Sequence, residues 1–183
     1  FFSLSNGDLI LGKDLQTTVE GASGFIVDFT LRDFGASAYL AILTSENQQF
    51  CLEFSSTVGA WVKIGQQPEM NIHIYDFYVD TLAVGSPVYR AVHYTEPEKF
   101  EIQQLITNSN WVTKFNDPNT VALWGPGKFD QTTGSYVSCS IDGTTVASIE
   151  FLASAWTKVI ISSSAQFPAI KQQTVIATMQ NVL

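Results

Sequence analysis

Residues 25–56 constrain the fold of this chain more than any other stretch. They read FIVDFTLRDFGASAYLAILTSENQQFCLEFSS, three runs of strand length separated by turn-forming residues near Gly35 and Asn47. In the first run, apolar side chains occupy every second position: Phe25, Val27, Phe29 and Leu31. Because successive side chains of a strand point to opposite faces, this pattern predicts a strand with one buried face. The three runs together predict an antiparallel meander that buries one side against a second sheet.

The remainder of the chain repeats this pattern. About eleven to thirteen short runs follow one another at intervals of roughly 8–12 residues, which is typical of a β-sandwich or barrel. Residues 70–84 carry apolar side chains on both phases, as a central strand does. Residues 96–108 fit a helix and a strand about equally well, and both remain open. Asp142 and Gly143, between two alternating runs, predict a type I′ hairpin turn.

These patterns predict an all-β protein in which residues 1–183 form a single domain. The expected architecture is an antiparallel β-sandwich of two sheets, of the jelly-roll or laminin-G-like kind. Hydrophobic residues make up 45% of the 183 residues and charged residues only 14%, against a usual share of about 25%. This composition indicates a folded domain with an uncharged polar surface.

The charge of the chain disfavours two classes of partner. There are 17 acidic and 9 basic residues, which gives a net charge of −8, and the basic residues are scattered. Binding to phosphate groups requires clustered Lys and Arg, so we expect neither a nucleic acid nor an anionic membrane surface as partner. No apolar run reaches the ~18–20 residues of a membrane span. The chain begins with Phe1 in place of Met, and we expect it to be processed or excised from a longer precursor.

The two cysteines, Cys51 and Cys139, are compatible with one disulfide or with two free thiols. Cys139 shares the phase of its apolar neighbours, whereas Cys51 is opposite in phase to Phe50 and Leu52. A disulfide requires Cα atoms about 4.4–6.8 Å apart and converging Cβ vectors. The phases therefore favour two buried thiols.

Four short elements carry a family resemblance: AYLAILT at 38–44, LEF at 52–54 followed by GAWVKI at 59–64, the strand and Asp-Gly turn at 137–143, and VIISS at 159–163. Together they resemble the invertebrate farnesoic-acid-O-methyltransferase-like domain, a β-sandwich module of laminin-G-like architecture. The resemblance implies a non-catalytic recognition module for carbohydrate or another extracellular polymer.

No sequence motif indicates catalysis. Methyl transfer from S-adenosylmethionine usually requires a Gly-rich strand–turn–helix, and no G-x-G-x-G follows a predicted strand, so we expect no methyltransferase activity and no cofactor. There is no G-x-S-x-G elbow, and we expect no catalytic residues. His73 and Asp76 point to opposite faces of a predicted strand, which argues against a metal site. We interpret the acidic residues on predicted strands as solvent-facing rather than as a glycosidase pair: Asp28, Glu53, Asp76, Asp80 and Glu150.

Two tryptophans lie in polar segments that are predicted to be loops. Trp111 belongs to ITNSNWVTKFND and Trp124 to LWGPGKFDQ. Aromatic rings stack on sugar faces while amides and carboxylates bond sugar hydroxyls, and binding sites of sandwiches usually lie on loops. Plugging the end of the sandwich is the alternative role for each ring. The candidate ligand-binding residues are Asn108, Asn110, Trp111, Phe115, Asp117, Trp124, Lys128 and Asp130.

We therefore expect a non-enzymatic extracellular or secreted recognition protein whose partner is a glycan or another extracellular polymer. A structural or assembly module, such as a viral capsid projection or coat domain on a virion surface, is the alternative, and it would form a homo-oligomer. A carrier of apolar ligands between the sheets is a third reading, supported by the aromatic content of 13%.

Overall fold

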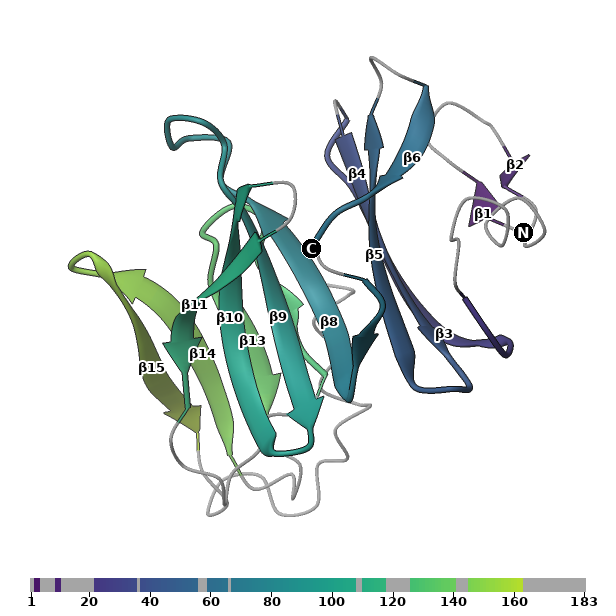
Figure 1. The fold of residues 1–183 in the computed structure, drawn as a ribbon. Helices are drawn as coiled ribbons and strands as arrows, with labels where there is room; N and C mark the ends of the chain where they lie inside the picture. The colour runs from purple at the N-terminus through teal and green to yellow at the C-terminus, as the bar shows by residue number, and fades with distance from the viewer. Residues whose placement is uncertain are drawn as a thin grey trace.

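The computed structural model describes residues 2–3, 9–10, 22–35, 37–55, 59–65, 67–107, 110–117, 126–140 and 145–162 (Figure 1). Every regular element among them is a β-strand, and all strand pairs are antiparallel. The prediction of an antiparallel all-β fold is confirmed. No helix in this part of the chain is long and apolar enough to cross a membrane.

The strands form three larger sheets. The first sheet has the order β3 (Ile26–Asp33), β4 (Ser37–Thr44), β5 (Gln48–Ser55), β6 (Ala60–Lys63), and β7 (Glu69–Met70) also pairs with β5. The middle sheet consists of β8 (Ile72–Val79), β9 (Val88–Thr95), β10 (Glu98–Thr107) and β11 (Asn110–Asn116). The third sheet consists of β12 (Lys128–Phe129), β13 (Tyr136–Cys139), β14 (Val146–Leu152) and β15 (Ala155–Ser162). The short strands β1 (Phe2–Ser3) and β2 (Leu9–Ile10) pair with each other. The expected sandwich of two sheets is not confirmed, because the described strands form three.

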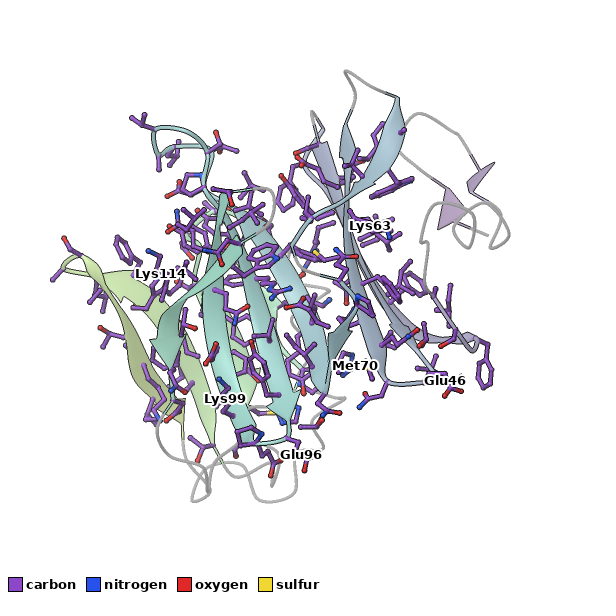
Figure 2. All side chains as sticks on the ribbon, in the orientation of Figure 1. Glu46, Lys63, Met70, Glu96, Lys99 and Lys114 are labelled. Carbon is purple, nitrogen blue, oxygen red and sulfur yellow. The ribbon has the colours of Figure 1, made fainter. Side chains whose placement is uncertain are left out.

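The middle sheet is covered on both faces, as Figure 1 shows. Toward the first sheet, its side chains pack with Tyr39, Ala41, Cys51 and Ile64. Toward the third sheet, they pack with Phe129, Tyr136, Ala147 and Ile149. Side chains fill the space between the sheets (Figure 2). Strand β8 is an edge strand of the middle sheet, but it is buried on both faces, as the apolar residues of 70–84 predict, and six consecutive residues of it, 74–79, are buried.

The meander of residues 25–56 is confirmed as β3, β4 and β5, but the predicted buried face of β3 is wrong. Phe25, Val27 and Phe29 are 70%, 51% and 49% exposed. The register shifts between Ile26 and Asp28, and such a bulge changes which side chains share a face. Asp28, Thr30 and Arg32 follow this bulge, alternate regularly and direct their polar side chains at β8.

The burial of Asp76 contradicts a second prediction from the sequence. It was interpreted as solvent-facing, yet it is 0% exposed. Its carboxylate accepts two hydrogen bonds from Arg32, Nε to Oδ1 at 2.6 Å and Nη2 to Oδ2 at 2.9 Å, and one from the Phe129 amide at 2.8 Å. The register of β8 shifts between Ile74 and Asp76, which turns the acid toward these donors. One buried carboxylate thus joins β3, β8 and β12.

Two further segments are strands. Residues 96–108, left open between helix and strand, contain β10, and the predicted connection at 108–118 contains β11. The turn at Asp142 and Gly143 lies outside the described residues, as do the predicted strands at 121–124 and 174–179. The strands that flank the turn pair as expected, with Cys139 opposite Val146.

Cys51 and Cys139 are both buried, and they are thiols, so the prediction of two buried thiols is confirmed. Cys51 points into the cluster between the first and middle sheets, while Phe50 and Leu52 pack on the opposite face of the first sheet. Burial raises the pKa of the Cys51 thiol to about 12. The thiolate, which is the reactive form, is therefore strongly disfavoured at Cys51.

Candidate functional site

A pocket of about 220 Å³ lies where all three sheets meet. Its lining comes from residues 28–30 of β3, residues 73–75 of β8 and residues 126–128, which lead into β12. The ion pair between Arg32 and the buried Asp76 lies close by in sequence on the same two strands and fixes β3 against β8. Two of the three segments that line the pocket are thus strands held to each other by an ion pair.

The polar centre of the pocket is a hydrogen-bonded pair formed by Asp28 and His73. His73 Nε2 lies 2.8 Å from Asp28 Oδ2, and because a carboxylate only accepts, Nε2 is the donor. The other oxygen, Oδ1, accepts the backbone amide of Phe29 at 2.8 Å. The Asp28 side chain is 52% exposed, and that of His73 28%. The carboxylate is therefore oriented by two donors and still open to a ligand.

Aromatic side chains surround this pair. The His73 ring meets Tyr75 edge to face with centroids 5.0 Å apart, and Tyr75 is buried beneath the pocket. Phe29 also lines the pocket, and in sequence it alternates with Asp28 and Thr30, whose side chains are directed at β8. Thr30 Oγ1 donates to the Tyr75 carbonyl at 3.4 Å. The pocket therefore combines one oriented acid–base pair with apolar ring surface.

A second histidine lies directly across the ladder from His73. His93, on β9, is the register partner of His73, and its ring stacks on Tyr75 at 6.0 Å. Its Nε2 is buried without a hydrogen-bond partner among the described residues, 3.7 Å from Glu98 Oε1. Burial lowers the pKa of His93 below its usual value, an effect that the Glu98 carboxylate opposes.

This environment predicts a pH dependence of stability. Because the pKa of His93 is lower in the folded than in the unfolded chain, the unfolded state binds more protons below the unfolded pKa of about 6.5. The free energy of unfolding should therefore fall as pH drops from about 6.5 through the folded pKa of His93. Urea denaturation between pH 8 and pH 5 should show a shallower decline for His93→Gln than for the native chain. Parallel curves for the two proteins would contradict the assignment.

The structure does not bring the sequence-predicted ligand residues together. Lys128 lines the pocket, beside β8. Asn110, Trp111 and Phe115 lie on β11, which forms the opposite edge of the middle sheet from β8. Asn108 and Trp124 lie outside the described residues.

Trp111 is partly buried and packs against the core between the first and middle sheets. The guanidinium carbon of Arg90 lies 4.2 Å from the centroid of its ring. Its Nε1 is buried without a hydrogen-bond partner among the described residues and faces Gly65, where an added Cβ would lie 2.7 Å from it. The ring therefore packs against the core, but among the described residues its N–H lacks the carbonyl partner that the alternative role, plugging the end of a sandwich, would give it.

The two candidate aspartates have local partners. Asp117 is 5% exposed, and its Oδ2 accepts from Lys158 Nζ at 2.6 Å, which links the end of β11 to β15. Asp130 accepts the Thr132 amide at 2.9 Å and the Thr133 hydroxyl at 2.8 Å, and these bonds lower the pKa of Asp130. Both carboxylates stabilise local structure.

The two central pocket residues, Asp28 and His73, were not selected from the sequence. A signal existed in β3, where Asp28, Thr30 and Arg32 form a polar stripe opposite the apolar positions. Within the residues that the structure describes, no group of three or more His, Cys, Asp or Glu side chains could hold a metal ion.

No protein-family model matches this chain, and a comparison with curated proteins likewise finds no match.

Proposed function

We propose that this chain is a non-enzymatic recognition module that binds carbohydrate in the pocket between β3, β8 and residues 126–128. The observation that carries the proposal is the oriented, half-exposed carboxylate of Asp28, held by His73, whose ring contacts the Tyr75 ring. Sugar hydroxyls are bonded by carboxylates and imidazoles, and the C–H face of a sugar packs on an aromatic ring.

Each polar group of the pocket has a role in this proposal. Two acceptor sites of the Asp28 carboxylate are filled by the Phe29 amide and by His73. Its remaining, exposed lone pairs accept a hydrogen bond from a sugar hydroxyl. Lys128 supplies an ammonium donor from the opposite wall of the pocket. The Tyr75 ring, which contacts His73 beneath the pocket, supplies the apolar contact.

The pocket volume supports a small ligand. At about 220 Å³ it lies below the roughly 300–1,000 Å³ of sites for drug-sized molecules. A single sugar ring, at the end of a chain or free, is a ligand of suitable size. Longer chains would extend into solvent.

The number of carboxylates that line the pocket favours sugar binding over glycoside hydrolysis. Hydrolysis with either stereochemical outcome requires two carboxyl groups about 5–9.5 Å apart across the substrate. Among the described lining residues, Asp28 alone carries a carboxylate.

A glycan array probed with the full chain tests this proposal. We expect saturable binding to a subset of glycans, and His73→Ala should weaken it by roughly tenfold or more, because a charge-assisted hydrogen bond is lost and Asp28 is left unoriented. Asn110→Ala is the matched control, because Asn110 is exposed at the far edge of the middle sheet. This control should bind like the native chain. Loss of binding in Asn110→Ala but not in His73→Ala would contradict the proposal.

A further inference from the structure

The loop between β8 and β9 presents two apolar side chains to solvent. Leu82 is 92% exposed and Val84 is 104% exposed, the two highest values among the large hydrophobic residues given for the described chain. Figure 1 shows this loop extending beyond the ends of the strands at the upper left. The two side chains therefore lie on a convex projection rather than in a groove.

The loop is held in one conformation by its own hydrogen bonds. Asp80 Oδ1 accepts the amides of Leu82 and Ala83, each at 3.1 Å. The Asp80 amide donates to the Pro87 carbonyl at 3.0 Å, and the Ser86 amide to the Ala83 carbonyl at 3.1 Å. Because these bonds fix the backbone, Leu82 and Val84 are kept exposed and do not fold back onto the sheet.

A second turn presents apolar side chains in the same way. Strands β14 and β15 are joined by Ala153 and Ser154, both with positive φ, at 48° and 70°. The residues before this turn, Phe151 and Leu152, are 60% and 45% exposed. Such a two-residue turn holds its flanking side chains rigidly.

The two turns are linked by a row of aromatic rings. Tyr78 and Tyr89, at the base of the β8–β9 loop, stack with centroids 6.1 Å apart. Tyr89 meets Trp156 at 5.4 Å, and Trp156 meets Phe151 at 5.7 Å. Leu82, Val84, Phe151 and Leu152, here called the apolar tips, therefore belong to one side of the molecule, with amphipathic aromatic side chains below them.

We propose that the apolar tips insert into the surface of a neutral, zwitterionic lipid membrane. A broad deformable surface can receive two separate projections at once, whereas one protein pocket receives a single projection. Tyr and Trp rings below the tips match the depth of the lipid headgroups, where such rings are enriched. This inference is independent of carbohydrate binding.

The charged residues near the apolar tips favour neutral over anionic lipid headgroups. Residues 64–89 contain no Lys or Arg, and neither do residues 150–157, although the exposed Lys114 of β11 lies beside the β14–β15 hairpin (Figure 2). Asp80 lies at the base of the loop, and burial, together with the charges of Asp80 and Asp130, raises the pKa of Tyr78. Anionic headgroups would be repelled by these acids, while neutral headgroups would not.

Vesicle flotation with the full chain tests the proposal. We expect the native chain to float with phosphatidylcholine vesicles, with no gain when phosphatidylserine is added. The double variant Leu82→Ser/Val84→Ser should lower the partition coefficient by roughly tenfold or more. Met70→Ser is the control, since Met70 is 52% exposed and Figure 2 shows it well below the β8–β9 loop and on the other side of the view. It should float like the native chain.

A measurement on the native chain alone keeps the proposal testable if a variant misfolds. Phosphatidylcholine brominated along its acyl chains should quench tryptophan fluorescence, because Trp156 lies below the tips. Absence of both flotation and quenching at millimolar lipid would overturn the proposal, as would equal flotation of the double variant. If the native chain instead self-associates in sedimentation velocity and the double variant does not, the tips contact a second copy and the lipid assignment is overturned.

Discussion

Replacing Asp76 with alanine is expected to destabilise the fold by about 3–5 kcal/mol, the usual cost of breaking a buried ion pair from one side. The variant leaves the Arg32 guanidinium and the Phe129 amide without their shared acceptor. Because these donors come from two different sheets, the loss should lower the urea midpoint of the whole domain. Urea denaturation followed by circular dichroism measures the effect.

Asp28→Ala is the matched control for this prediction. Asp28 is also an acid on a strand with a basic partner, but its side chain is 52% exposed, so we expect a loss of about 1 kcal/mol or less. The double variant Arg32→Met/Asp76→Met should recover much of the stability, since it removes both charges together. Equal losses for Asp76→Ala and Asp28→Ala would show that Asp76 does not hold the sheets together.

Arg90→Met is the second substitution with a large expected effect, again about 3–5 kcal/mol. Arg90 is 0% exposed, and its guanidinium donates to both oxygens of Glu69 at 2.6 and 2.7 Å and to Gln103 Oε1 at 2.9 Å. It also covers the Trp111 ring. Arg90→Lys should be destabilised as well, because an ammonium cannot form the paired bonds to a carboxylate.

Lys99→Met is the control for Arg90. Lys99 Nζ also pairs with an acid, Glu101 at 2.7 Å, and lies 4.2 Å from the centroid of an aromatic ring, Tyr94, but its side chain is 34% exposed. Since Glu101 keeps its bonds from Gln103 and Thr113, we expect a loss of about 1 kcal/mol. Thermal unfolding of the two variants should therefore differ clearly. Similar melting temperatures would contradict a structural role for the buried arginine.

The fold class could be predicted from the sequence because strand periodicity is a local property. Residues 70–84 have apolar side chains on both phases, and β8 is the strand buried on both sides. Cys51 was placed correctly on the face opposite Phe50 by the same rule. The number of sheets could not be predicted in this way, because periodicity does not tell which strands pair.

Bulges account for the errors within single strands. An extra residue in β3 and another in β8 change the phase partway along each strand, and a period-two reading continues past them. The burial of Asp76 depends on Arg32, 44 residues earlier in the chain. No local sequence pattern shows that Asp76 and Arg32 pair.

The candidate site was missed for the same reason. Asp28 and His73 are 45 residues apart in sequence, and only the packing of β3 on β8 brings them together. Trp111 was interpreted as a loop residue because of the asparagines around it, while its β-favouring neighbours Val112 and Thr113 place it on β11. Lys128 was selected for its position near Trp124, and it lines the pocket.

The most direct test of carbohydrate recognition at the β3–β8 pocket is a titration of the ¹⁵N-labelled chain, followed by amide chemical shifts. The ligand is the monosaccharide that gives the strongest signal on the glycan array. We predict saturable shifts at residues 28–30, 73–75 and 127–128, with residues 110–116 unchanged. Saturable shifts confined to residues 110–116 would contradict the proposal and assign recognition to the opposite edge of the sheet.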